Sequence, residues 1–95
     1  MFIVLLRFST GKDRASSLMG GHQAWIDKGF RDGVFLLVGS LKPGAGGTVL
    51  AHGVSRADLD RRVQEDPFVE HGVVTAEVLD VAASKADERL RFLLT

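Results

Sequence analysis

The sequence predicts a single small α+β domain, residues 1–95, and three observations support this fold class. The length of 95 residues is enough for one domain. Apolar segments rich in strand-forming residues recur at 2–8, 34–38, 48–54 and 72–81. A segment with helical spacing separates the first two strands, and another separates the last two. The predicted order is therefore βαββαβ, followed by a tail over 82–95.

The first strand and the first helix are the most strongly patterned elements. Residues 2–8 are almost continuously apolar, which is typical of a strand buried on both faces. A helix is predicted from Arg14 to Phe30, with Asp13 as its N-cap. Its apolar positions recur three or four residues apart, so one stripe faces the core. His22 falls on that stripe and is predicted to face inward.

A hairpin connects the second and third strands. Pro43-Gly44-Ala45-Gly46-Gly47 has the composition of a turn between 34–38 and 48–54. The same glycines invite comparison with a phosphate-binding loop. No Gly-Lys-Ser/Thr sequence follows them, so a flexible hairpin is the better interpretation.

The second helix has clear start and stop signals. Ser55 begins a capping box in which Asp58 takes the place of glutamate. The helix has to end by Glu65, because proline pushes the residue before it out of the helical region. Asp66 is then placed to cap a short turn over 67–71, with Pro67 at its first position.

Right-handed crossovers turn this order into a four-stranded antiparallel sheet with both helices on one face, a ferredoxin-like fold. Strands 2–8 and 34–38 are apolar on both faces, but two helices cover only one. We therefore expect a homodimer in which the uncovered faces of two sheets pack together. The tail over 82–95 is expected to form a helix at 85–94, rather than an added strand, or to form part of an interface.

Composition excludes several classes of partner and location. Twelve basic and twelve acidic side chains cancel, so no charge footprint for nucleic acid or an anionic membrane is present. No run approaches the ~20 apolar residues of a membrane helix. The absence of cysteine fits a reducing cytoplasm. His52 and His71 lack metal-ligand spacing, so no metal and no cofactor are implied.

One constellation of polar residues points to chemistry. The predicted topology brings His22, Ser40 and Asp66 to the same end of the fold. Imidazole transfers protons near neutral pH, and a carboxylate on one ring nitrogen fixes its tautomer and stabilises the imidazolium. His22 and Asp66 are thus the candidate catalytic pair, and Ser40 is a candidate contact for the substrate or the imidazole.

Other residues are candidates for binding the substrate. Trp25 and Phe68 would wall an apolar pocket, and Gly39 would let a ligand approach the backbone. Arg7 is the one charge in the first strand, either exposed at an edge or an anchor for an anion.

Structural interpretations stand beside the functional ones. An inward histidine is more often a hydrogen-bonded core residue than a catalyst. Asp66 has a role as a cap, which is compatible with pairing to His22. Ser40 lacks the surroundings of a nucleophile elbow and is more typical of a strand end, and Trp25 is more typical of a core or an interface.

At these residues the chain resembles the YciI family, the YCII-related domain. The resemblance covers roughly residues 2–81. It rests on the apolar first strand, the helical His22, Gly39-Ser40, the hairpin, and Asp66-Pro67-Phe68 followed by Gly72. The chain departs from common members at Gly20-Gly21, where bulkier residues are usual.

The resemblance implies a fold, an assembly and roles for two residues. Such proteins have a ferredoxin-like fold and associate as dimeric α+β barrels. His22 and Asp66 correspond to the family's proposed catalytic histidine and aspartate. One characterised branch removes chloride from a chlorinated hydroxyquinol-type aromatic, which indicates lyase-like chemistry in the family without assigning it to this chain.

The first functional hypothesis is a small cytoplasmic enzyme that uses a His–Asp pair for general acid/base chemistry. Its reaction would be an elimination or isomerisation on a small, partly aromatic molecule. The alternative is a non-catalytic ligand-binding or accessory module with the same pocket. A weaker alternative, based on fold analogy alone, is a cofactor-free monooxygenase.

Overall fold

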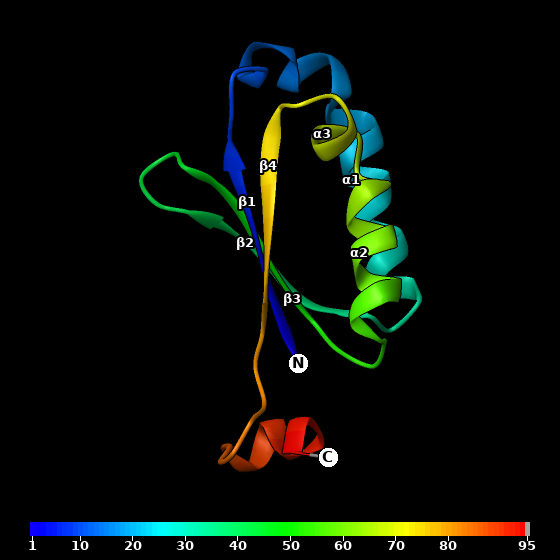
Figure 1. The fold of residues 1–95 in the computed structure, drawn as a ribbon, viewed down its shortest axis with the longest axis vertical. Coiled ribbons are helices and arrows are strands. Elements are labelled where there is room, and N and C mark those ends of the chain that lie inside the picture. Colours follow the sequence, from blue (N-terminus) through cyan, green and yellow to red (C-terminus); the bar gives the residue numbers. More distant parts are fainter. Residues whose placement is uncertain (95) are drawn as a thin grey trace.

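The computed structural model describes residues 1–94 and contains a four-stranded antiparallel sheet in the order β2-β3-β1-β4. The strands are β1 (Phe2–Phe8), β2 (Phe35–Leu41), β3 (Gly46–Ala51) and β4 (Val74–Asp80). The α-helices are α1 (Ala15–Arg31), α2 (Arg56–Gln64) and the short α3 (Pro67–Glu70). All three lie on one side of the sheet (Figure 1). The predicted ferredoxin-like fold class is confirmed.

The core lies between the inner face of the sheet and the helices. Along β1, Phe2, Val4 and Leu6 are buried and point toward the helices. From α2, Leu59 and Val63 pack against this layer, both at most 2% exposed. Trp25 of α1 donates its indole N–H to the carbonyl oxygen of Arg62 at 2.8 Å, which ties α1 to α2.

The start of α1 differs from the prediction, because Asp13 is not its N-cap. A 3-10 turn, η1 (Lys12–Arg14), precedes the helix, and Arg14 occupies the cap position without a side-chain cap bond. The amide of Arg14 donates to Gly11 at 3.0 Å, and the amide of Ala15 donates to Lys12. These backbone bonds satisfy amides that a capping side chain would otherwise serve.

The hairpin is shorter than predicted, because two of its glycines belong to the sheet. Ser40 pairs with Gly47 and Leu41 pairs with Gly46, which leaves only residues 42–45 as the turn. Gly46 has φ +129°, and a Cβ there would lie 1.9 Å from the carbonyl oxygen of Leu6. Glycine at this position therefore allows β3 to pair closely with β1.

The outer face of the sheet, opposite α1, α2 and α3, carries an apolar row (Figure 1). Cross-strand partners share a face, and one row runs through all four strands. It consists of Leu37, Leu50, Ile3 and Leu79. Leu37 is 54% exposed and Leu79 is 39% exposed. Toward the other end of this face, Arg7 forms an ion pair with Glu77 at 2.8 Å.

The chain leaves the sheet after β4 and ends in a 3-10 helix, η2 (Glu88–Leu94), set apart from the three α-helices (Figure 1). The helix predicted at 85–94 is therefore present over 88–94, and residues 81–87 form neither helix nor strand. Thr95 lies outside the described residues. The ring of Phe92 meets His52 edge-on at 5.4 Å. Within residues 1–94, no helix has both the length and the apolar character needed to cross a membrane.

Candidate active site

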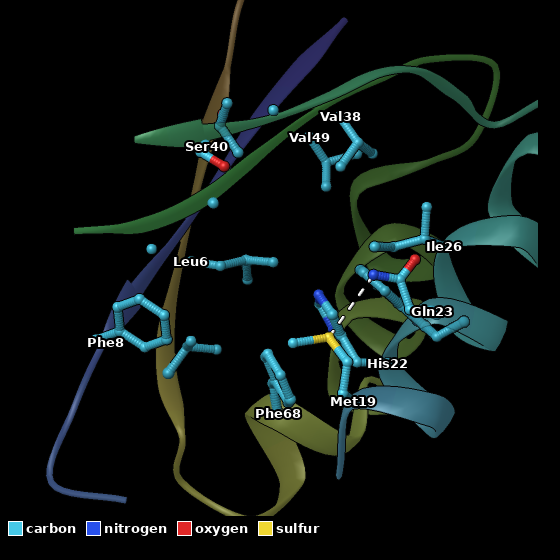
Figure 2. Close-up of a pocket in the computed structure, with 16 residues that line it drawn as sticks. Leu6, Phe8, Met19, His22, Gln23, Ile26, Val38, Ser40, Val49 and Phe68 are labelled. Carbon is cyan, nitrogen blue, oxygen red and sulfur yellow. Dashed lines mark hydrogen bonds between the residues drawn. The ribbon is translucent and has the colours of Figure 1, made fainter. Parts of the chain in front are cut away.

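A pocket of about 360 Å³ lies between the inner face of the sheet and α1 (Figure 2). Leu6, Val38 and Val49 line it from the strands, and Met19 and Ile26 line it from α1. The polar residues in its lining are His22, Gln23, Ser40 and Thr48. None of the residues that line it is an aspartate, glutamate, lysine or arginine. The pocket therefore favours an apolar ligand with few polar groups and no formal charge.

His22 and Asp66 meet at one wall of this pocket. The Nδ1 atom of His22 lies 2.8 Å from Oδ1 of Asp66. The side chain of Asp66 is fully buried, whereas that of His22 is 14% exposed. A carboxylate only accepts hydrogen bonds, so the short contact assigns a proton to Nδ1 of His22. In the neutral imidazole, Nε2 then carries a lone pair, and among residues 1–94 no side chain or backbone group is hydrogen-bonded to it.

The local sequence explains why the Asp66 carboxylate is held at this place. Asp66 is the N-cap of α3, and its Oδ1 accepts the amide N–H of Phe68 at 3.0 Å. Pro67 follows at the first helical position, where its missing N–H is harmless. One oxygen therefore accepts two hydrogen bonds. The other oxygen, Oδ2, is buried and has no hydrogen-bond partner within residues 1–94.

Two aromatic side chains flank the His22 ring. Phe68 stacks on it with a centroid separation of 3.9 Å and an interplanar angle of 3°. Trp25 lies nearly parallel to it at 6.0 Å. The stacking and the hydrogen bond to Asp66 together restrict rotation of the imidazole ring and fix its position relative to the pocket. Phe68 and Trp25 both line the pocket, and Trp25 is also a core residue, 7% exposed.

Ser40 and Gly39 line the pocket from β2, on the side opposite His22 (Figure 2). Ser40 pairs with Gly47, and Gly47 pairs with the inward-facing Leu6, so the three residues share the inner face. The serine hydroxyl and the imidazole therefore face a common space without touching each other.

Arg7 is apart from the other candidates. It alternates with the inward-facing Leu6 and Phe8, so its side chain lies on the outer face, paired with Glu77. The sequence predicts either an edge-exposed position or an anion anchor for Arg7. The edge position is wrong, because β1 is an interior strand of the sheet; Arg7 is instead exposed on the outer face, about half accessible and ion-paired. It does not line the pocket.

Sequence reasoning overlooked Gln23 and Met19. Both line the pocket, and the amide nitrogen of Gln23 lies 3.6 Å from the sulfur of Met19 (Figure 2). The sequence does contain a signal for Gln23: it directly follows His22, at the edge of the apolar stripe of α1, where a polar side chain can reach a pocket. Among residues 1–94, no three His, Cys, Asp or Glu side chains gather as a metal site would require.

Comparison with solved structures shows a shared fold. The chain is similar to the 5-chloro-2-hydroxyhydroquinone dehydrochlorinase from Burkholderia phenoliruptrix AC1100, whose structure is a complex with 2,5-dihydroxybenzoquinone. The TM-score is 0.67 at 15% sequence identity, over 85% of this chain and 93% of that one. This likeness shows the fold alone: a small α+β domain with a four-stranded antiparallel sheet. The sequence matches no protein-family model and no curated protein.

Proposed function

We propose that this protein is a small-molecule enzyme in which His22 is the general acid/base and Asp66 orients it. The observation that carries the proposal is the 2.8 Å contact between a fully buried carboxylate and a histidine that lines a pocket. A carboxylate behind an imidazole favours the tautomer with a free Nε2 and stabilises the imidazolium that forms when Nε2 takes a proton. Nε2 is then the atom that exchanges protons with the ligand.

The chemistry that fits this pair is elimination or isomerisation. Nε2 of His22 removes a proton from a carbon or hydroxyl of the substrate, and the electron pair left behind forms a new π bond. In an elimination the leaving group departs with its own electron pair; in an isomerisation the imidazolium returns the proton at another atom. Asp66 remains a carboxylate throughout and balances the positive charge of the ring.

The pocket supports a small, planar and uncharged substrate. Its walls are mostly apolar, Phe68 and Trp25 contribute aromatic side chains to its lining, and the Ser40 hydroxyl offers a hydrogen-bonding group opposite His22. The dehydrochlorinase with the same fold acts on a chlorinated hydroxyhydroquinone, as its name states. We infer that substituted hydroxyaromatic compounds with a leaving group, or their keto tautomers, are the first substrates to test.

The test is an elimination assay with a panel of halogenated hydroquinones and phenols, read by halide release and by ultraviolet absorbance. The variant His22→Gln should lower turnover by about 10²–10⁴-fold, because it removes the proton acceptor. His71→Gln is the matched control, since His71 is 48% exposed and lies outside the pocket. It should retain wild-type turnover.

A binding module is the competing function, and the same panel separates it from the enzyme. In a binding module, calorimetry finds a ligand whose affinity changes in His22→Gln, and no compound is turned over by the wild type. Equal turnover in His22→Gln and in the wild type would overturn the acid/base role. If His22→Gln lowers Tm strongly and the wild type binds no compound of the panel, His22 is a structural core residue.

We further propose that two copies associate through the outer face of the sheet, in the manner of dimeric α+β barrels. The support is the apolar row that includes Leu37 and Leu79, both substantially exposed in the single chain. We propose a cytoplasmic location on the absence of cysteine. Membership of the YciI family is likewise a proposal, supported by the order and spacing of the residues that carry the resemblance.

A further inference from the structure

Two adjacent glycines interrupt the sequence of α1 directly before His22, and their environments differ. A Cβ added to Gly20 would meet no atom within 4 Å. A Cβ added to Gly21 would lie 3.0 Å from Cγ and 3.7 Å from Cβ of Pro67. Glycine inside a helix is unfavourable relative to alanine at either position. Of the two glycines, only Gly21 lies so close to another residue that an added side chain would be crowded.

Gly21 lies where α1 meets α3. Two consecutive residues of α1 face three consecutive residues at the start of α3. Gly21 is against the ring of Pro67, while His22 bonds to Asp66 and stacks on Phe68. Because Asp66 caps α3 and Pro67 begins it, the carboxylate and the proline ring belong to one rigid turn. Any displacement of Pro67 away from α1 therefore carries Asp66 away from His22.

We propose that Gly21 is a positioning residue: its missing side chain lets α3 approach α1 closely enough for Asp66 to hold His22. A Cβ at 3.0 Å from a ring carbon is closer than side chains normally pack, so the turn would have to move by a few tenths of an ångström. Such a shift lengthens a hydrogen bond of 2.8 Å. The inference rests on the proposed function only in taking His22 as the group whose position matters.

The test compares Gly21→Ala with Gly20→Ala. Both substitutions improve helix propensity equally, so their difference isolates the contact with Pro67. We expect Gly20→Ala to raise Tm by about 4–8 °C and to leave the ring ¹⁵N shifts of His22 unchanged. Gly21→Ala should have a lower Tm than Gly20→Ala by several degrees, and its Nδ1 signal should move as the bond to Asp66 weakens.

A second pair of variants tests the route by which Gly21 acts. Pro67→Ala removes the ring carbon that a Cβ at residue 21 would meet and leaves the Cβ of residue 67 at an ordinary 3.7 Å. In that background, adding Gly21→Ala should no longer shift the Nδ1 signal. If Gly21→Ala alone fails to fold, the double variant should restore folding.

Three results would overturn the proposal. The first is that Gly21→Ala matches Gly20→Ala in both Tm and ¹⁵N shifts. The second is a lower Tm with an unchanged His22 signal, which would make Gly21 a packing residue only. The third is no rescue by Pro67→Ala. These measurements need no substrate, so they remain separate from the assay that decides whether His22 is catalytic.

Discussion

Substitution of Asp66 by asparagine and by alanine separates geometry from charge at the candidate site. Oδ1 of Asp66 accepts hydrogen bonds from His22 and from the amide of Phe68 in a fully buried setting. Asparagine has nearly the same shape, keeps an oxygen that can accept both bonds, and is an equally good N-cap. Alanine removes the acceptor altogether.

The expected free energies differ in size. Asp66→Ala loses the cap of α3, which is worth about 1 kcal/mol, and leaves the ring N–H of His22 without an acceptor, which costs about 1–3 kcal/mol. We expect the free energy of unfolding to fall by about 2–4 kcal/mol, and Tm to fall by roughly 8 °C or more. Asp66→Asn weakens two charge-assisted bonds but also removes a buried charge whose Oδ2 has no hydrogen-bond partner in the described part of the chain. These opposing terms are similar in size, so its free energy of unfolding should stay within about 1 kcal/mol of the wild type.

Urea unfolding followed by circular dichroism and by the fluorescence of Trp25, the only tryptophan, measures both variants. A free energy of unfolding of the alanine variant equal to that of the wild type would refute the role assigned to Oδ1. A loss in the asparagine variant as large as in the alanine variant would show that charge, rather than shape, holds the pair. Once a substrate is known, Asp66→Asn should still lower turnover, by up to ~10⁴-fold, because a neutral amide cannot stabilise the imidazolium.

Two further predictions concern the outer face and the helix ends. In sedimentation, the wild type should be a dimer of about twice the 10.3 kDa chain mass, and Leu37→Glu should convert it to a monomer. The control Ser16→Glu, on the exposed surface of α1, should leave the dimer intact. A monomeric wild type would contradict the proposed interface. Hydrogen bonds from Lys28 and then Arg62 lower the pKa of Asp32 below its usual value. This contribution to stability is therefore present above the ordinary aspartate pKa of ~3.9 and is lost as pH falls through the lowered value. The stability gap between the wild type and Asp32→Asn in urea unfolding should be present at neutral pH and close in acid; a gap that does not change with pH would exclude this linkage.

The parts of the fold that were predicted correctly have local causes. The apolar pattern of residues 2–8 matches β1, and Ser55 caps α2 by accepting the amide of Asp58, as its sequence predicts. The start of α1 was wrong, because backbone bonds of a preceding 3-10 turn replaced the expected cap at Asp13. The extent of the hairpin was wrong because Gly46 pairs across the sheet, and glycine composition alone indicates a turn.

The candidate site depended on long-range topology as well as on local signals. His22 and Asp66 are 44 positions apart, and the βαββαβ order was enough to expect them at one end of the fold. Their catalytic roles stay predictions. The stacking of Phe68 on the imidazole could not be predicted, because spacing along a short turn does not define ring geometry. The position of Arg7 followed from strand alternation once Leu6 and Phe8 were known to face inward.

Several features that weaken this protein occur together where α1 meets α3. Gly20 and Gly21 in α1 cost about 1 kcal/mol each relative to alanine, and the buried Oδ2 of Asp66 lacks a hydrogen-bond partner within residues 1–94. At other sites local preference and tertiary structure agree: Ser55 caps α2, and the core residues Val4 and Leu59 are almost completely buried. Sequences that fold well are consistent across levels, and departures from that consistency are expected where function constrains the residues. The meeting point of α1 and α3 is such a departure, and this places the most informative substitutions at Gly21 and Asp66.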